Sequence, residues 1–168
     1  LTMAKNKGLS IPICWNSSAY ESIDALELLD KIVDIWLPDL KTLDEKLSTQ
    51  GFRAKNYPQV AKAAISWMKN HSYTKIHNPK FSETDTIDSF AEKNLPTMKS
   101  GLIVRHLMLP NRKNDTLDIL HWFKKQLDPE AFLSLMSQYT PIVERKEKIQ
   151  KVNLIENRFI NASELDEV

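Results

Sequence analysis

The sequence predicts an α/β domain built on a parallel sheet, with about four βα units that form part of a TIM-like (βα) barrel. Short apolar runs alternate with amphipathic helical segments, and the connections between them are long enough for right-handed crossovers. Nucleotide-binding glycine loops of the Gly-x-Gly-x-x-Gly and Walker types are absent from the sequence. Four strands cannot close a barrel, so we expect exposed sheet edges, an unfilled inner face and further βα units that belong with this chain.

The first part of the chain predicts two strands and a helix between them. The opening residues resemble the end of a helix, because lysines and then Gly8, a typical left-handed cap, follow apolar residues. Residues 9–15 form a short apolar run that predicts a buried strand, and residues 22–31 have the apolar spacing of an amphipathic helix. Residues 33–41 alternate with period two, and one face of this strand changes from apolar to charged at its carboxyl end.

The middle of the chain predicts a helix and a long insertion. The helix begins at 56–58, with Pro58 in its first turn and with Val60, Ala64 and Trp67 on its buried stripe. Residues 71–100 are polar and poorly periodic, so we expect a surface insertion within the domain, with a helical turn at 85–93.

The last part predicts two further strands, at residues 101–109 and 132–137, with an amphipathic helix over 116–127 between them. We expect Asp115 to cap this helix. The inward residues of the helix are expected to be Leu117, Leu120 and Phe123. A highly charged, solvated segment is expected at 142–151, and the start of another helix at 161–164.

Composition limits the classes of function. The chain has 168 residues, 42% of them hydrophobic and 27% charged, which fits one folded domain. Its formal net charge of +1 provides no general attraction for nucleic acid or for an anionic membrane. No run approaches the roughly 20 apolar residues of a membrane span, and no signal peptide is evident, so we expect a cytoplasmic protein without nucleic-acid or membrane partners. A single cysteine, Cys14, cannot alone ligate an iron–sulfur cluster or a structural zinc ion, so the chain has no metal site of its own.

In parallel α/β barrels, functional residues gather where the strands end at their carboxyl side. This rule selects four groups of candidate residues: Asn16-Ser17-Ser18; Asp39 with Lys41; Met108-Leu109-Pro110-Asn111 with Arg105 or His106 just before them; and Ser137-Gln138-Tyr139.

Asp39 and Lys41 lie two residues apart and therefore share a face of their strand. The lysine can offer three donors to a ligand carboxylate, while the aspartate accepts from hydroxyl or ammonium groups. Such a pair suits a zwitterionic ligand that bears a ribose. Two alternatives stay open: a salt bridge that only closes the strand end, and a Schiff-base nucleophile at Lys41.

Arg105 and His106 point to opposite faces of their strand, so one enters the barrel and the other meets the helix layer. A histidine inside a strand is more often a packing residue than a ligand. Cys14 is expected to be a small buried apolar residue.

Five segments of the chain resemble, in the right order, the C-terminal half of radical SAM proteins in the branch of pyruvate formate-lyase activating enzyme. They cover most of the chain except residues 71–100. The segments are Asn16-Ser17-Ser18-Ala19-Tyr20-Glu21-Ser22; Ile32-Val33-Asp34-Ile35-Trp36-Leu37-Pro38-Asp39-Leu40-Lys41; Asn56-Tyr57-Pro58-Gln59-Val60-Ala61-Lys62-Ala63-Ala64-Ile65; Gly101-Leu102-Ile103-Val104-Arg105-His106-Leu107-Met108-Leu109-Pro110-Asn111; and Met136-Ser137-Gln138-Tyr139-Thr140-Pro141.

The resemblance implies a partial (βα)6 barrel in which a [4Fe–4S] cluster, held by a CxxxCxxC loop and reduced by an electron donor, cleaves S-adenosylmethionine (SAM) to a 5′-deoxyadenosyl radical. In activating enzymes this radical abstracts hydrogen from a glycine of a partner protein, the glycyl-radical enzyme. This chain would then contribute to an oxidoreductase of the activase type.

The resemblance also assigns roles to residues of the site. Lys41 would face the methionine carboxylate and Asp39 the polar side of the cofactor. Arg105, selected by its place near a strand end, is a further cofactor-binding candidate. Asn16 and Ser17 match a strand end that can help to hold a monovalent cation, although activating enzymes have aspartate where this chain has Asn16. The last two candidates, Gln138 and Tyr139, match a strand end near the SAM carboxylate, where Thr140 replaces the expected histidine.

Two segments of the family pattern are missing, the CxxxCxxC loop and the Gly-Gly-Glu-like segment that meets the SAM amino group. Both are expected upstream of Leu1, so we expect this chain alone to be inactive. It is then either a fragment of a longer enzyme, which the helix end at residue 1 favours, or a non-catalytic protein-interaction module derived from that fold.

Overall fold

The computed structural model describes residues 1–78, 95–141, 154–166 and 168. Four strands run parallel in the order β1-β2-β4-β5, and β3 pairs antiparallel with β4. The parallel α/β prediction is thereby confirmed. The strands are β1 (Cys14–Ser17), β2 (Ile35–Pro38), β3 (Lys75–His77), β4 (Thr97–Leu107) and β5 (Phe132–Met136).

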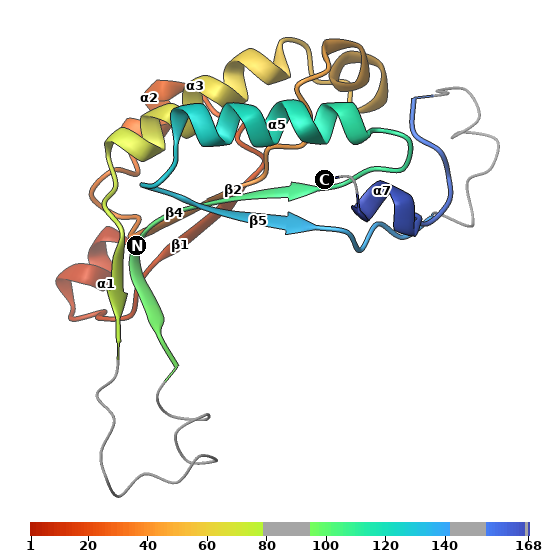
Figure 1. The fold of residues 1–168 in the computed structure, drawn as a ribbon. Helices are drawn as coiled ribbons and strands as arrows, with labels where there is room; N and C mark the ends of the chain where they lie inside the picture. Colours follow the sequence, from red (N-terminus) through yellow and green to blue (C-terminus); the bar gives the residue numbers. More distant parts are fainter. Residues whose placement is uncertain (79–94, 142–153, 167) are drawn as a thin grey trace, which may run out of the picture.

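Three helices, α2, α3 and α5, lie over one face of this sheet (Figure 1). Their starts follow from the sequence in two cases: the Ser22 hydroxyl accepts from the Ala25 N–H at the start of α2, and Pro58 lies in the first turn of α3. Among the described helices, none has the length and apolar character needed to cross a bilayer. The helical elements are α1 (Thr2–Asn6), α2 (Ile23–Glu27), the π-helical turn η1 (Leu47–Gly51), α3 (Tyr57–Asn70), α5 (Lys113–Gln126) and α7 (Ala162–Asp166).

The core lies between the sheet and these helices. Trp36, Leu102 and Val104 are buried from the sheet side. From the helices come Ala61, Ala64, Ile65, Met68, Ile119 and Phe123. The predicted inward stripes were therefore only partly right, because Val60, Trp67, Leu117 and Leu120 are only half-buried. Trp67 instead packs edge-on against Trp36 at the side of the core, with ring centroids 5.8 Å apart.

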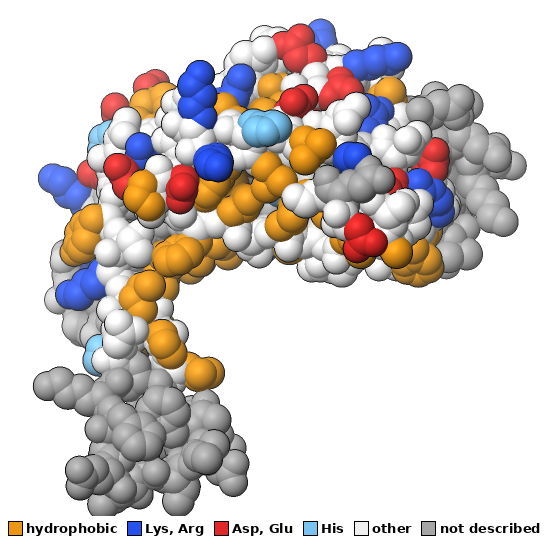
Figure 2. Space-filling model, viewed as in Figure 1, with side chains coloured by type: hydrophobic (Ala, Val, Ile, Leu, Met, Phe, Trp, Pro, Cys, Tyr) orange, Lys and Arg blue, Asp and Glu red, His pale blue; other side chains and the backbone are white. Residues whose placement is uncertain are grey.

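In the part of the chain that the structure describes, no helix covers the other face of the sheet, which is compatible with an incomplete barrel. In β4, Leu102, Val104 and His106 are buried under the helices, whereas Ile103, Arg105 and Leu107 remain partly exposed on the opposite side. Phe132 pairs with Ile103 and is 47% exposed. Figure 2 shows apolar side chains along the β5 side of the sheet, below α5, and on the upper part of the arm.

Residues 71–100 are not simply a surface insertion. β3 and the first residues of β4 form an antiparallel arm that projects from the sheet (Figure 1). Gly101 lies at the bend between arm and sheet with φ +136, and a Cβ there would lie 2.7 Å from the Met98 Cε. The predicted strand 101–109 thus begins at Thr97, because four more residues pair with β3 or extend toward it. The predicted helical turn at 85–93 and the charged segment at 142–151 lie outside the described residues.

The first strand was predicted too long, and the expectation that Cys14 is buried was wrong. β1 begins at Cys14, and Cys14 is exposed on the open face of the sheet. Its side chain points away from the helices because Trp15, the next residue, takes the face that packs on the core. The predicted helix over 22–31 ends at Glu27, and turns complete the connection to β2.

Candidate functional site at the carboxyl edge of the sheet

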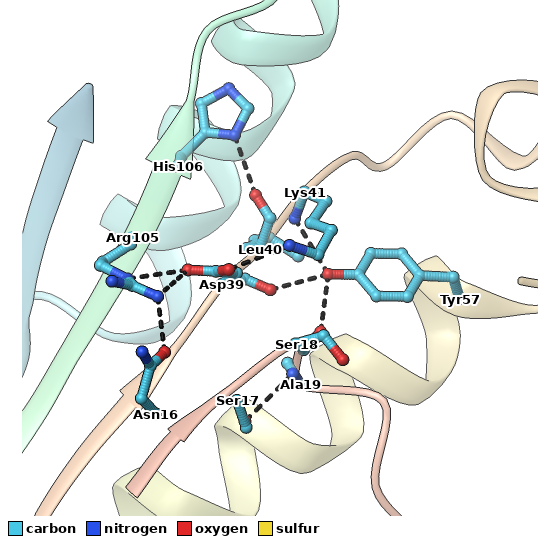
Figure 3. Close-up of polar contacts among 10 residues, drawn as sticks. All are labelled: Asn16, Ser17, Ser18, Ala19, Asp39, Leu40, Lys41, Tyr57, Arg105 and His106. Atoms are coloured by element: carbon cyan, nitrogen blue, oxygen red, sulfur yellow. Dashed lines mark hydrogen bonds and ion pairs between the residues drawn. The ribbon is translucent and has the colours of Figure 1, made fainter. Parts of the chain in front are cut away.

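The ends of three strands bring Asn16, Asp39 and Arg105 together. Asn16 lies in β1, Arg105 lies in β4, and Asp39 directly follows β2 and forms a parallel bridge with Arg105. The side chains extend to the open face of the sheet, where they meet one another (Figure 3). The sequence rule that selects carboxyl ends of strands therefore predicted this cluster.

The Asp39 carboxylate is the centre of the cluster. Its Oδ1 accepts from the Arg105 Nε at 2.8 Å and lies 2.6 Å from the Arg105 Nη2, while its Oδ2 accepts from the Lys41 Nζ at 2.9 Å. The Arg105 Nη2 also donates to the Asn16 Oδ1 at 2.6 Å. One carboxylate thus faces two cations, which leaves the cluster with a surplus of one positive charge.

The salt bridge considered as an alternative for Asp39 and Lys41 is present. This salt bridge does not use all the hydrogen-bond donors of Lys41, because an ammonium group carries three donors and the side chain is 40% exposed. A ligand carboxylate can therefore still be bound by Lys41.

A cavity of about 280 Å³ opens beside this cluster. Asp39, Lys41 and Arg105 form its polar side. The remaining wall is mostly apolar and comprises Leu40, Phe52, Leu107, Leu109 and Met136. Such a cavity suits a small molecule with a charged end and an apolar or aromatic body.

Tyr57, at the start of α3, fixes the ends of two strands, and the sequence reasoning gave it no such role. Its buried hydroxyl accepts from the backbone N–H of Lys41 at 3.0 Å and lies 2.7 Å from the Asp39 carbonyl and 3.0 Å from the Ser18 carbonyl, so its one proton is donated to these acceptors. Burial raises the pKa of Tyr57, which keeps the hydroxyl protonated as a donor. No sequence signal distinguishes this tyrosine from an ordinary core residue near a helix start.

A second polar layer lies beneath the cluster, on the helix side. The His106 Nδ1 is 2.8 Å from the Leu40 carbonyl, and its Nε2 is 3.0 Å from the Thr116 Oγ1. A neutral ring satisfies both contacts by donating from Nδ1 and accepting at Nε2. Burial lowers the pKa of His106 and so favours this neutral form. The interpretation of His106 as a packing residue fits this position, and Arg105 is the neighbour that enters the open face.

Asp115 does not cap α5 as predicted. It lies within the helix, where its Oδ2 accepts from the Thr42 hydroxyl at 2.5 Å and its Oδ1 accepts from the Leu43 N–H at 2.7 Å. The carboxylate therefore holds the segment after Lys41 rather than the helix start, whose N-cap residue is Arg112.

Three other candidate residues do not join the cluster. The Ser17 hydroxyl accepts from the Ala19 N–H at 3.2 Å and so stabilises the local turn. Gln138 and Tyr139 follow β5 at the same edge of the sheet, but in the described part of the chain no hydrogen bond or ion pair joins them to Asn16, Asp39, Lys41 or Arg105. Their assignment as binding residues stays a prediction.

Among the described residues, no group of three or more His, Cys, Asp or Glu side chains could hold a metal ion. The whole sequence has one cysteine, so this chain does not fit a [4Fe–4S] cluster. The donor set of Lys41, Arg105 and Asp39 beside an apolar wall does fit the zwitterionic end and the adjoining body of SAM.

Comparison with known proteins shows that the chain is similar to an uncharacterized protein of Methanocaldococcus jannaschii, with 27% identity over 139 residues. The match covers 82% of this chain and 32% of the relative, so the chain spans about a third of that protein's length. No family model matches the chain, and no solved structure matches it.

Proposed function

We propose that this chain forms the part of a radical SAM protein, similar to glycyl-radical-enzyme activating enzymes, that binds the methionine end of SAM. The observation that carries the proposal is the shared Asp39 carboxylate, held between Lys41 and Arg105 at the mouth of a largely apolar cavity. The resemblance of five segments to that family supports the same assignment.

In this proposal each residue of the cluster has a distinct task. Lys41 binds the ligand carboxylate through its free donors, because its ammonium group is partly exposed at the cavity mouth. Arg105 is fixed by Asp39 and Asn16 and adds a second positive charge nearby. Asp39 limits the surplus to one charge, which matches one carboxylate better than a phosphate dianion.

The bound SAM would supply a radical for hydrogen abstraction only together with a reduced cluster. The chain lacks the thiolates for that cluster, so the described residues are assigned to binding and orientation alone. The electron donor, the glycyl-radical partner and the oxidoreductase activity belong to the whole protein and are proposed for it by resemblance.

The binding role can be tested by calorimetry with SAM and with decarboxylated SAM, on the longest protein that the gene encodes. Lys41→Ala should weaken SAM binding about tenfold or more, because it removes a charge-assisted hydrogen bond. Lys46→Ala, at an exposed lysine beyond the cavity, is the matched control. Decarboxylated SAM should bind wild type and Lys41→Ala equally, and an unchanged SAM affinity in Lys41→Ala would refute the role.

The Schiff-base alternative is less well supported, because the Lys41 Nζ is held by the Asp39 carboxylate at 2.9 Å, and this contact would have to break before the nitrogen could attack a carbonyl. Borohydride trapping of a carbonyl substrate on Lys41 would support the Schiff-base alternative. The interaction-module alternative gains support from the projecting arm and predicts that no cluster cysteines exist upstream in the gene.

A further inference from the structure

A second cavity, of about 700 Å³, lies far from the carboxyl edge, at the base of the arm. It is an open groove, here called the arm groove. Its lining residues include Lys75, His77 and Lys99 from the two strands of the arm, together with Ser10 and Asp34 from the adjoining loops. None of these residues contributes to the site described above.

The arm groove is positively charged because its one described carboxylate is already engaged. Asp34 Oδ2 is 3.1 Å from the Lys5 Nζ and accepts from the Ile13 N–H at 2.8 Å. Lys75 and Lys99 are exposed, and in the described part of the chain neither forms an ion pair. Among the described residues, Lys75 and Lys99 are therefore two cations of the groove without an acidic partner.

A bulge in the pairing of β3 with β4 explains why Lys99 lies in the groove together with Lys75. Lys75 pairs with Ser100 and Ile76 pairs with Met98, so Lys99 is an extra residue without a partner. Such a bulge redirects a side chain, and here Lys99 comes to line the same groove as Lys75.

The arm also offers a strand edge. β3 is the last strand of the path β1-β2-β4-β3, and its three residues are all exposed. An edge strand presents backbone groups that a further strand can pair with, and cross-strand pairs of opposite charge stabilise such an addition.

We propose that the arm groove and the β3 edge bind an extended acidic segment of a partner protein, through strand addition to β3 and ion pairs to Lys75 and Lys99. Charge complementarity selects this occupant over an apolar strand, and the free edge selects an extended peptide over a compact anion. The proposal goes beyond SAM binding and does not depend on it.

Fluorescence anisotropy with a labelled peptide of alternating glutamate and valine tests this. The wild-type protein, in the longest form that the gene encodes, should bind the peptide, and the double variant Lys75→Glu/Lys99→Glu should weaken binding about tenfold or more. The matched control is Lys124→Glu/Lys125→Glu, which makes the same charge change at exposed positions of α5. Equal losses in both variants, or no binding by the wild type, would overturn the proposal.

Three further probes separate strand addition from simple charge attraction. A peptide of the same charge with N-methylated backbone should bind at least several-fold more weakly, because it cannot complete a strand ladder. Single-stranded oligothymidylate and inorganic phosphate should displace the labelled peptide poorly. Equal binding of the N-methylated peptide, or efficient displacement by the oligonucleotide, would contradict an acidic strand as the occupant.

Discussion

Arg105 directs both its Nε and its Nη2 to a single oxygen of Asp39, at 2.8 and 2.6 Å. The other oxygen of that carboxylate remains for Lys41. Asp39 therefore connects a cation of β4 with a cation beyond the end of β2 and helps to orient both, while Asn16 provides a second contact for Arg105.

Replacing Asp39 by asparagine tests this dependence, because Asp39→Asn keeps the shape but removes the charge. Asp39 and Arg105 are about a quarter exposed and Lys41 is 40% exposed, so solvent screens both pairs and we expect a loss of only about 1 kcal/mol in the free energy of unfolding. Urea unfolding at low salt and in 1 M NaCl measures it, and the loss should shrink at high salt. Glu27→Gln, at an exposed position, should change stability by less than about 0.5 kcal/mol; a loss as large as that of Asp39→Asn would contradict the shared carboxylate.

Removal of the Tyr57 hydroxyl should be more costly. Tyr57→Phe leaves the Lys41 N–H and the carbonyls of Ser18 and Asp39 without their partner, and we expect a loss of about 1–3 kcal/mol. The control is Tyr20→Phe, whose hydroxyl donates to the Lys55 carbonyl at the surface. If the two variants unfold at the same urea concentration, the Tyr57 hydroxyl does not hold the strand ends as described.

Stability should fall in mild acid because of His106. Burial lowers the pKa of this histidine in the folded protein, so below about pH 6.5 the unfolded chain takes up a proton that the folded protein resists. The contribution of neutral His106 to the free energy of unfolding is thus fully present above that pH. It declines as the pH falls toward the pKa of the folded protein, by at most about 1.4 kcal/mol per pH unit for one proton.

Urea unfolding of the wild type and of His106→Gln at pH 7 and pH 5.5 checks this decline. The variant should show a smaller difference between the two pH values, whatever its stability at pH 7. His121→Gln, at an exposed position of α5, should keep the wild-type difference. Identical pH dependence in the wild type and His106→Gln would show that another group titrates.

Asp115 should matter as an anchor of the segment after Lys41. Asp115→Ala removes the buried acceptor of both the Thr42 hydroxyl and the Leu43 N–H, and we expect a loss of about 2–3 kcal/mol. Asp118→Ala, exposed on the same helix, is the control and should be nearly neutral. Thermal unfolding measured by circular dichroism compares them, and similar midpoints would refute the anchoring role.

The sequence was sufficient to predict the parallel strands and the face that carries Asp39 and Lys41, because alternation and the strand-end rule are local signals. It could not reveal Tyr57 or Asp115 as binding partners of the backbone, since their contacts cross from α3 and α5 to the end of β2. The arm was missed for a similar reason: Lys75 and Ser100 pair across a polar segment whose residues show no clear alternation.

The length of β4 has a consequence for any attempt to shorten this protein. Its first residues build one side of the arm, and its last residues carry Arg105 and His106 within the sheet. An ordinary surface loop can be deleted at its base. Here, however, the second strand of the arm and the central strand of the sheet are the same continuous strand, β4. A deletion that removes part of the arm must therefore end before Gly101, so that the bend and the rest of β4 are kept.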